Sequence, residues 1–319
     1  MKIRFAALIF LFLASTSFSQ QHHEQKPEDP FTLKKLTDRI YALYGRGGNI
    51  GFYVGSNAVF VVDSQFLDLA PGIVEKIKTV TDKPIKYLLN THHHPDHVGG
   101  NQHFLSFAII LAHDNVRKRV LASPQEILAT YPKYLQEAKT KGDTDRATWF
   151  QQQIDWAKKV KVEEIPAPFL TFDSEFRIHL DETIHVWHTP PAHTDGDGVA
   201  YFEKSKVLHM GDLFFHKVIP FIDVEGGGSA TGYLKAIDLV LSRVPSDVVI
   251  IPGHGEVTDV AGLKEFRAYI QQIIELAKAA KAAGKTKEQF VKETDLPAYK
   301  EWRGYEDRFK ENLEAAYGE

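Results

Sequence analysis

The chain has 319 residues, enough for one large domain or two small ones. It contains no cysteine, which excludes disulfides, thiolate nucleophiles and thiolate metal ligands. The formal net charge is −4; without the two basic residues near the start, Lys2 and Arg4, it is −6, from 36 basic and 42 acidic residues. A mildly acidic chain without a basic run has no evident attraction for nucleic acid or an anionic membrane, so we expect neither as a partner.

The first 19 residues predict a secretory signal peptide. A basic start precedes the apolar run Phe5–Ala14, and the small residues around Phe18 offer a cleavage site before Gln20. The apolar run is too short for a stable membrane anchor, and no later run is long enough to span a bilayer. Residues 20–32 are polar and predict a flexible segment. We therefore expect a periplasmic or secreted protein.

Three short β-type runs follow, separated by glycine and asparagine: Ile40–Tyr44, Ile50–Val54 and Ala58–Val62. This pattern predicts an antiparallel meander. Asp63 ends the third run, where an unpaired carboxylate would be costly to bury. It is either a simple turn or helix cap, or a partner for another polar group. Apolar residues at helical spacing then predict a helix over 67–79.

The stretch from Thr91 to Gly100 holds four imidazoles and one carboxylate within six consecutive positions, His92 to His97. Neutral imidazole nitrogens and carboxylate oxygens are ligands that suit zinc. An apolar run, Ile85–Asn90, precedes the stretch and predicts a buried strand. In an extended segment, residues two apart point the same way, so His92 and His94 can hold one ion. Asp96 and His97 follow the turn at Pro95 and can hold a second.

The remaining chain alternates strands with helices, which predicts a layered α/β fold. Residues 117–162 are charged and helix-prone and predict a helical insertion; its aromatic side chains either pack on the core or line the mouth of the active site. The C-terminal part, including residues 284–319, predicts amphipathic helices.

Three further polar residues lie where a predicted strand gives way to a loop: His193, Asp212 and His254. Strand ends are rigid and suit the geometry of a metal site. His179, His185 and His188 are isolated on or beside strands, and we interpret them as structural or exposed.

The pattern His92-x-His94-x-Asp96-His97, followed in order by the other three residues, resembles the signature of the metallo-β-lactamase superfamily over roughly residues 33–258. The resemblance implies a four-layer αβ/βα sandwich over residues 33–283, with a C-terminal helical extension. It also implies two zinc ions per chain, one held by His92, His94 and His193. The other is held by Asp96, His97 and His254, with Asp212 bridging both. It favours Asp63 as an outer partner of a metal ligand.

By the same resemblance, the activity is hydrolysis. A hydroxide between the ions would attack the carbonyl carbon of a small-molecule ester, lactone, thioester or β-lactam, with Asp96 orienting it and accepting its proton. Asp212 resembles the bridging aspartate of glyoxalase II-type thioesterases and lactonases, and the histidine-rich β-lactamase subclass typically lacks it.

Two alternatives stay open. One is a redox or sulfur-handling member of the same fold, with iron in the same ligands. The other is a non-catalytic protein that keeps metal for structure, against which the number of ligands argues, since structural zinc sites close with four protein ligands.

Overall fold

The computed structural model describes residues 29–319. The predicted signal peptide, residues 1–19, and most of the predicted flexible segment, residues 20–28, lie outside the described part. Residues Phe31–Glu319 form one unit. The fold begins earlier than the predicted boundary at residue 33, because the ring of Phe31 packs against Gly72 and the following residue pairs in a sheet. None of the helices within residues 29–319 combines the length and apolar character that a membrane span requires.

The first sheet contains the predicted meander. It has seven strands in the order in which they occur along the chain. Neighbours are antiparallel from β1 to β4 and parallel from β4 to β7, which confirms the meander. The strands are β1 (Thr32–Lys35), β2 (Ile40–Tyr44), β3 (Ile50–Val54), β4 (Val59–Val62), β5 (Ile85–Leu89), β6 (Ile109–His113) and β7 (Leu170–Phe172).

The second sheet has five strands in the order β12-β11-β10-β9-β8. All pairs are antiparallel except β11 and β12, which are parallel and joined through helix α6 (Ala230–Arg243). A parallel pair needs such a crossover, because a short turn can join only antiparallel strands. The strands are β8 (Glu175–His179), β9 (Thr183–His188), β10 (Gly198–Phe202), β11 (Val207–His209) and β12 (Val249–Ile251).

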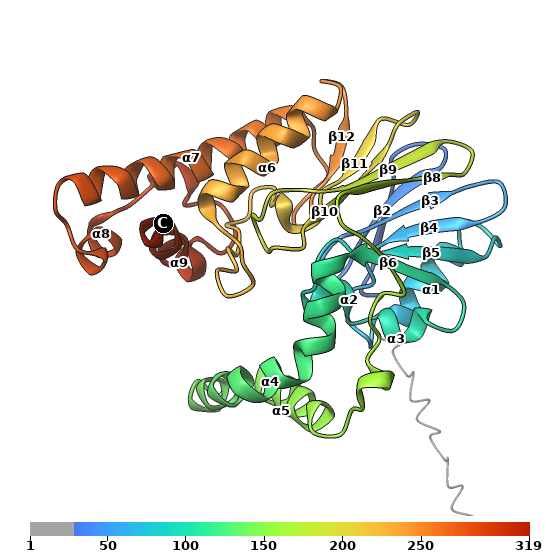
Figure 1. The fold of residues 1–319 in the computed structure, drawn as a ribbon, viewed down its shortest axis with the longest axis horizontal. Helices are drawn as coiled ribbons and strands as arrows, with labels where there is room; N and C mark the ends of the chain where they lie inside the picture. Colours follow the sequence, from blue (N-terminus) through green and yellow to red (C-terminus); the bar gives the residue numbers. More distant parts are fainter. Residues whose placement is uncertain (1–28) are drawn as a thin grey trace, which may run out of the picture. The chain divides into compact units, whose positions relative to one another are not determined.

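The two sheets pack face to face, with a helical layer on each outer side (Figure 1). Between them, Phe202 of β10 stacks on Tyr53 of β3 and meets Phe60 of β4 edge to face at 6.1 Å between centroids. Helices α1 (Ala70–Lys78) and α3 (Asn101–Phe104) cover the first sheet. Helices α6 and α7 (Val260–Ala282) cover the second. This helix–sheet–sheet–helix arrangement confirms the predicted αβ/βα sandwich.

The predicted insertion is a helical hairpin, α4 (Asp114–Thr140) and α5 (Thr144–Ala157), held together by buried Ile127 and Ile154. It connects β6 to the turn η1 (Val162–Glu164) and β7. At the C-terminal end, α8 (Lys287–Glu293), the turn η3 (Pro297–Tyr299) and α9 (Tyr305–Gly318) follow α7. Phe309 and Leu313 of α9 are buried in the core that contains α7, because their spacing puts them on one helix face.

Candidate metal centre

The residues of the central motif change direction at Pro95. Strand β5 ends at Leu89, and the short helix α2 (Pro95–Val98) begins after His94, whose backbone is extended at φ −67° and ψ 147°. Proline suits the first turn of a helix because it has no N–H to leave unpaired there. The turn therefore separates His92 and His94 from Asp96 and His97, as the spacing predicts.

The three later candidates come from the second sheet. His193 lies in the loop between β9 and β10, and His254 follows β12. Asp212 lies in the turn η2 (Gly211–Leu213) just after β11, and Gly211 there has φ +51°, a conformation that glycine adopts without strain. All seven predicted ligands therefore lie in the loops, turns and short helix that follow the ends of strands of the two sheets.

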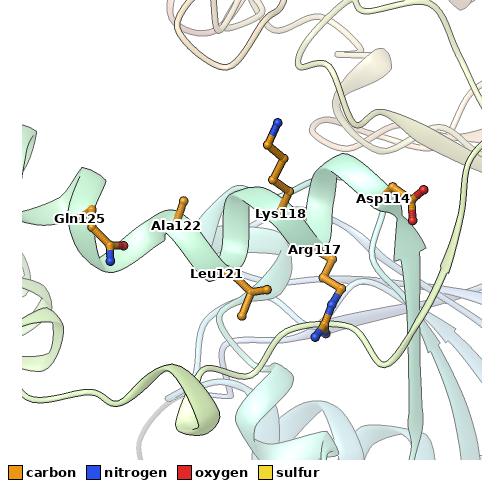
Figure 2. A pocket seen from close by; sticks show the side chains of 6 residues that line it. All are labelled: Asp114, Arg117, Lys118, Leu121, Ala122 and Gln125. Carbon is orange, nitrogen blue, oxygen red and sulfur yellow. The ribbon is translucent and has the colours of Figure 1, made fainter.

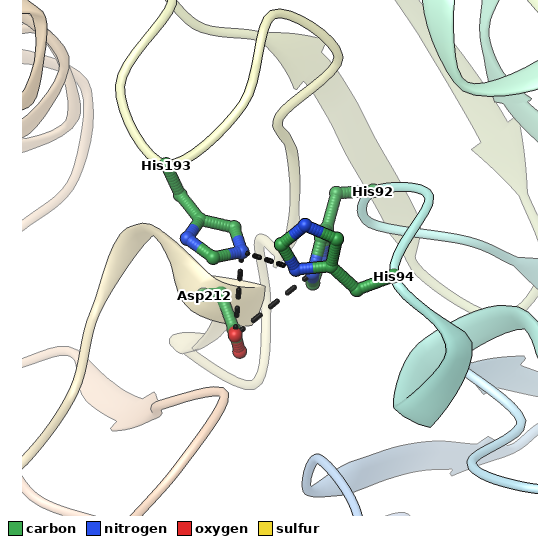
Figure 3. Close-up of side chains that lie close together, drawn as sticks. All are labelled: His92, His94, His193 and Asp212. Carbon is green, nitrogen blue, oxygen red and sulfur yellow. Dashed lines mark hydrogen bonds and ion pairs between the residues drawn. The ribbon is translucent and has the colours of Figure 1, made fainter. Parts of the chain in front are cut away.

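One group, which we call the three-histidine set, consists of His92, His94 and His193, with Asp212 beside it (Figure 3). His193 Nε2 lies 2.9 Å from His94 Nδ1. Asp212 Oδ2 lies 3.5 Å from His193 Nε2 and 3.9 Å from His92 Nε2. Ligand atoms about 2.0–2.1 Å from a tetrahedral zinc ion would stand roughly 3.3 Å apart. The observed spacing brackets that value, so these atoms fit a zinc ion.

The second group, which we call the aspartate–histidine set, consists of Asp96, His97 and His254. Asp96 Oδ2 lies 3.6 Å from His97 Nε2 and 3.3 Å from His254 Nε2. Asp212 also reaches this group, since its Oδ1 lies 3.1 Å from His97 Nε2 and its Oδ2 lies 3.4 Å from His254 Nε2. The carboxylate of Asp212 therefore stands between the two sets.

Three buried atoms at the centre make no hydrogen bond among the described residues: His92 Nε2, His97 Nε2 and Asp212 Oδ1. An unsatisfied buried polar group typically costs about 1–3 kcal/mol, so a native fold rarely keeps several together. Lone pairs that converge in this way are what a bound cation requires. The donor set therefore fits zinc, while the ligand role of each residue stays a prediction.

Asp63 supports this centre as an outer partner, through contacts with Thr91 and His97. Its carboxylate accepts hydrogen bonds from Thr91 N and Thr91 Oγ1, both at 2.8 Å, and lies 2.8 Å from His97 Nδ1. Thr91 Oγ1 lies 3.0 Å from His92 Nδ1. Asp63 thus contacts His97 directly and His92 through a hydroxyl group, leaving both Nε2 atoms directed at the centre. Its φ of +66° is uncommon outside glycine, and these bonds hold it there.

The two sets differ in their electrostatics. Burial lowers the pKa of His92 well below its usual value and that of His193 to about 3, which favours neutral imidazoles. Burial also acts to lower the pKa of His254, but the carboxylates of Asp212 and Asp96 raise it to about 9. Against its own burial, the pKa of Asp96 is lowered by His97 and His254.

Two glycines let the backbone approach the ligands closely. A Cβ atom at Gly48 would overlap the ring of His97, and one at Gly253 would overlap Asp212 Oδ1. Asn49, next to Gly48, donates hydrogen bonds from Nδ2 to Pro252 O at 2.9 Å and Gly255 O at 2.8 Å, so the meander also holds the His254 loop. Glycine-rich loops of this kind are visible in the sequence, but their partners across the fold are not.

Several residues around the site were not identified from sequence. Asp223 Oδ2 lies 2.9 Å from His94 Nε2, and Asp197 accepts hydrogen bonds from His193 N at 2.7 Å and Thr194 N. Arg119 of α4 binds Asp195 through two hydrogen bonds. The three consecutive glycines Gly226–Gly228 predict a tight loop, but nothing in the sequence singles out Asp223 in it.

The hairpin contacts Phe66, which lies in the loop between β4 and α1. Trp149 of α5 lies 6.4 Å from Phe66, centroid to centroid, and 5.6 Å from Tyr131 of α4. Burial raises the pKa of Tyr131 to about 12, and the charge of Asp96 contributes. Phe150, by contrast, is buried inside the hairpin. The aromatic side chains of the insertion thus pack within the hairpin and on Phe66, and a place for some of them at the mouth of the active site stays a prediction.

A pocket of about 530 Å³ lies along α4, but it contains none of the seven predicted ligands (Figure 2). The three isolated histidines also lie outside the clusters that could hold a metal within residues 29–319. His179 is exposed, His185 lies beside Glu175, and His188 stacks on His113 at 3.7 Å between centroids. These positions agree with their interpretation as structural or exposed.

The fold and the motif both have counterparts among known proteins. The DIM-1 metallo-β-lactamase is 19% identical, with a TM-score of 0.54, over 76% of this chain and 97% of that chain. A metallo-β-lactamase from Pontibacter korlensis is 16% identical, with a TM-score of 0.55, over 76% and 99%. The inverting sec-alkylsulfatase Pisa1 from Pseudomonas sp. is 16% identical, with a TM-score of 0.65, over 90% of this chain and 50% of that chain. At such low identity these likenesses show the fold alone.

Sequence comparison points the same way. A protein from Aquifex aeolicus (strain VF5), described only as uncharacterized, is 32% identical over 94 residues, which is 30% of this chain and 44% of that protein. The match therefore spans less than half the length of that relative. The family model of the metallo-β-lactamase superfamily matches residues 43–254, which include all seven predicted ligands. The resemblance read from the motif is thus confirmed: the chain belongs to the metallo-β-lactamase superfamily.

Proposed function

We propose that this protein is an exported dinuclear zinc hydrolase that cleaves an ester, lactone, thioester or β-lactam bond of a small molecule. The observation that carries the proposal is the position of Asp212. Its carboxylate lies between two complete groups of donor atoms, within 3.5 Å of His193 Nε2 on one side and 3.1 Å of His97 Nε2 on the other. A bridging carboxylate of this kind supports a pair of ions rather than one.

In this proposal the three-histidine set holds one ion and the aspartate–histidine set holds the other. Two zinc ions would supply an activated water near neutral pH and stabilise negative charge that develops on the substrate. The residues of the chain contribute the geometry. Thr91 and Asp63 fix the rings of His92 and His97, and Phe221 O accepts a hydrogen bond from His193 Nδ1 at 2.7 Å. Each of these bonds leaves the opposite ring nitrogen available to the centre.

Asp96 has a separate part in the proposal. Its side chain is 24% exposed, whereas Asp212 is 4% exposed, so Asp96 is the more accessible carboxylate of the centre. An accessible carboxylate at this position can orient a water molecule and accept its proton at Oδ1 or Oδ2. We therefore assign the catalytic role to Asp96, in addition to its place in the aspartate–histidine set.

The test combines metal analysis with a hydrolysis panel. The purified protein should contain close to two equivalents of zinc and hydrolyse at least one class among lactones, esters, thioesters and β-lactams. An exposed histidine provides the control: His179→Ala should keep both metal and activity, whereas a change at any of the seven ligands should not. Redox-active iron in place of zinc would favour the alternative redox or sulfur-handling function. Tightly held metal with no turnover on any class would favour a binding protein.

Export is tested separately. The sequence of residues 1–19 supports removal of a signal peptide, so protein recovered from outside the cytoplasm should begin at Gln20. Full-length protein confined to the cytoplasm would contradict export and leave the hydrolase proposal standing.

A further inference from the structure

The loop between η2 and α6 brings one acidic residue to a predicted metal ligand. Asp223 Oδ2 lies 2.9 Å from His94 Nε2, although the two residues are 129 positions apart. The Asp223 side chain is 13% exposed, and its Oδ1 accepts a hydrogen bond from Gly226 N at 2.8 Å. The carboxylate is therefore built into the loop and directed at the imidazole.

The opposite nitrogen of the same ring belongs to the centre. His94 Nδ1 lies 2.9 Å from His193 Nε2, inside the three-histidine set. If Nε2 donates its hydrogen to Asp223, the lone pair of Nδ1 is free for a cation. Metal-binding histidines commonly donate their second ring N–H to a carboxylate, which fixes the tautomer and makes the ligand more basic. The two distances at His94 describe this arrangement.

His93 offers a competing interpretation, because His93, His94 and Asp223 also lie close enough to hold a cation of their own. His93 Nε2 is 3.8 Å from Asp223 Oδ2, and His93 Nδ1 is buried without a hydrogen bond among the described residues. However, the distance between His94 Nε2 and Asp223 Oδ2 is the ordinary length of a charge-assisted hydrogen bond. A second cation here would also make the imidazole of His94 a bridge between two ions, which requires removal of both ring protons. The hydrogen bond is the simpler account.

A second connection ties the inserted hairpin to the same region. Asp195, two residues after His193, accepts hydrogen bonds from Arg119 Nε and Nη2, both at 2.7 Å. Asn115 Nδ2 donates to Asp195 O at 2.9 Å. A two-pronged guanidinium–carboxylate contact fixes orientation as well as distance. The first turns of α4 are therefore fastened to the His193 loop.

The two loops are also bonded to each other. Asp195 N donates to Gly226 O at 2.9 Å, and Asp223 N donates to His193 O at 3.0 Å. The chain of contacts runs from Arg119 through Asp195 to the Asp223 loop and ends at His94. It touches two members of the three-histidine set, whereas the direct partner of His97 in the aspartate–histidine set is Asp63.

We propose that Asp223 is a positioning residue that sets the tautomer and orientation of His94, and that Arg119, through Asp195, makes the α4–α5 hairpin part of the same support. Together they tune the three-histidine set selectively. This proposal rests on the proposed function only in taking the three-histidine set as a metal site. It gives the hairpin a role in metal affinity that is separate from contact with substrate.

The direct test uses the metal-free protein. Nitrogen-15 NMR of the His94 ring should show Nε2–H in the wild-type protein and in Asp223→Asn, whose amide oxygen still accepts. In Asp223→Ala the tautomers should mix. If the wild-type ring carries its proton on Nδ1, or if Asp223→Ala leaves the tautomer unchanged, the proposal is wrong whether or not the protein hydrolyses anything.

Metal affinity gives the second readout, by competition with a chromophoric chelator and by cobalt absorption spectra. Asp223→Ala should weaken the binding of one of the two metal equivalents roughly 10–100-fold and alter the cobalt spectrum. The affinity for the other equivalent should change less than about threefold. Arg119→Met should weaken the same equivalent about tenfold, with Arg119→Lys in between, because lysine cannot form the two-pronged contact. Lys118→Met, on the same helix, is the matched control and should have no effect.

The outcomes separate the two proposals. A wild-type protein that binds no metal would contradict the proposed function, while the NMR result would still decide the role of Asp223. Equal weakening of both equivalents in Asp223→Ala would overturn the selectivity. A third equivalent that disappears in His93→Ala would show that Asp223 belongs to a cation site instead. Thermal melting verifies that each variant is folded. If Asp223→Ala does not fold, the tautomer of the wild-type His94 ring and the metal affinities of the Arg119 variants decide the proposal.

Discussion

The two halves of the metal centre are built differently although they share Asp212. In the three-histidine set, His92 and His193 are fully buried, and every ring has an outer partner: Thr91, Asp223 or the carbonyl of Phe221. In the aspartate–histidine set, only His97 is fully buried; the side chains of Asp96 and His254 are 24% and 21% exposed. The ring of His254 stacks on Phe215 at 5.2 Å between centroids. The three-histidine set is thus the more buried half, although His94 is 16% exposed, and the aspartate–histidine set is the more exposed half.

This difference indicates a division of labour. A mostly buried set of imidazoles held by outer hydrogen-bond partners needs little rearrangement to bind a cation. A more open set that contains carboxylates leaves room for substrate and for movement of protons. We therefore expect changes in the buried half to act mainly on metal retention, and changes in the open half to act mainly on turnover.

The largest effect is expected for His193→Ala, which removes a ligand from the buried half. Hydrolysis should fall on the order of 10³-fold or more, because the activation of water depends on the metal. Zinc content should fall from about two equivalents to about one. Near-normal zinc content with near-normal kcat would remove His193 from the centre altogether, and His179→Ala is the control.

Asp212→Ser tests the bridge between the halves and should have the next largest effect. Removal of the shared carboxylate should reduce kcat by about 10²-fold and weaken the binding of both ions. Zinc titration followed by calorimetry measures the two affinities. If stoichiometry and rate stay the same, Asp212 is only a polar residue at the end of β11.

Asp63→Asn tests support shared by the halves, since Asp63 contacts His97 directly and His92 through Thr91. We expect metal affinity to fall roughly 10–100-fold, with both equivalents affected. Asp223→Ala is the comparison, because its effect should be confined to one equivalent. Selective loss of a single equivalent in Asp63→Asn would contradict the connection through Thr91.

The smallest effect is expected away from the centre, at the stacked pair His113 and His188. Burial lowers the pKa of both imidazoles. The charge of His113 lowers the pKa of His188 further, whereas the carboxylates of Asp114, Asp173 and Asp195 act to raise the pKa of His113. The unfolded chain then binds more protons below about pH 6.5, so stability is fully present above that pH and falls as the pH drops. His188→Gln should reduce the fall in Tm between pH 7 and pH 5 by roughly 1–3 °C. His179→Gln is the matched control. If the fall in Tm between pH 7 and pH 5 is the same in His188→Gln as in the wild-type protein, the pair does not contribute to the loss of stability in acid.

The sequence was sufficient for most of the fold, which depends on local patterns, and it named the seven candidate ligands through the family motif; their role as ligands stays a prediction. Apolar runs of five residues marked β2, β3 and β5, and the turn at Pro95 separated the two halves of the motif. Strand β1 was not predicted. None of its four residues is buried, although Leu33 packs partly against the core, and the strand lies in the sheet by pairing with β2.

The support around the ligands could not be predicted, because it depends on contacts between distant segments. Asp223 and His94 are 129 residues apart, and Arg119 and Asp195 are 76 apart. Carboxylates and arginines in loops and helices are common, and nothing in the local pattern marks these. Asp63 was an exception, since a carboxylate directly after a fully buried strand needs a partner wherever it lies.

The most direct test of the central claim is anomalous diffraction at the zinc edge, on crystals of the protein as purified. A bridging role of Asp212 predicts two peaks of similar height on either side of its carboxylate. One should lie within bonding distance of His92, His94 and His193, and the other of Asp96, His97 and His254. A single peak, or peaks that none of these side chains contacts, would contradict it.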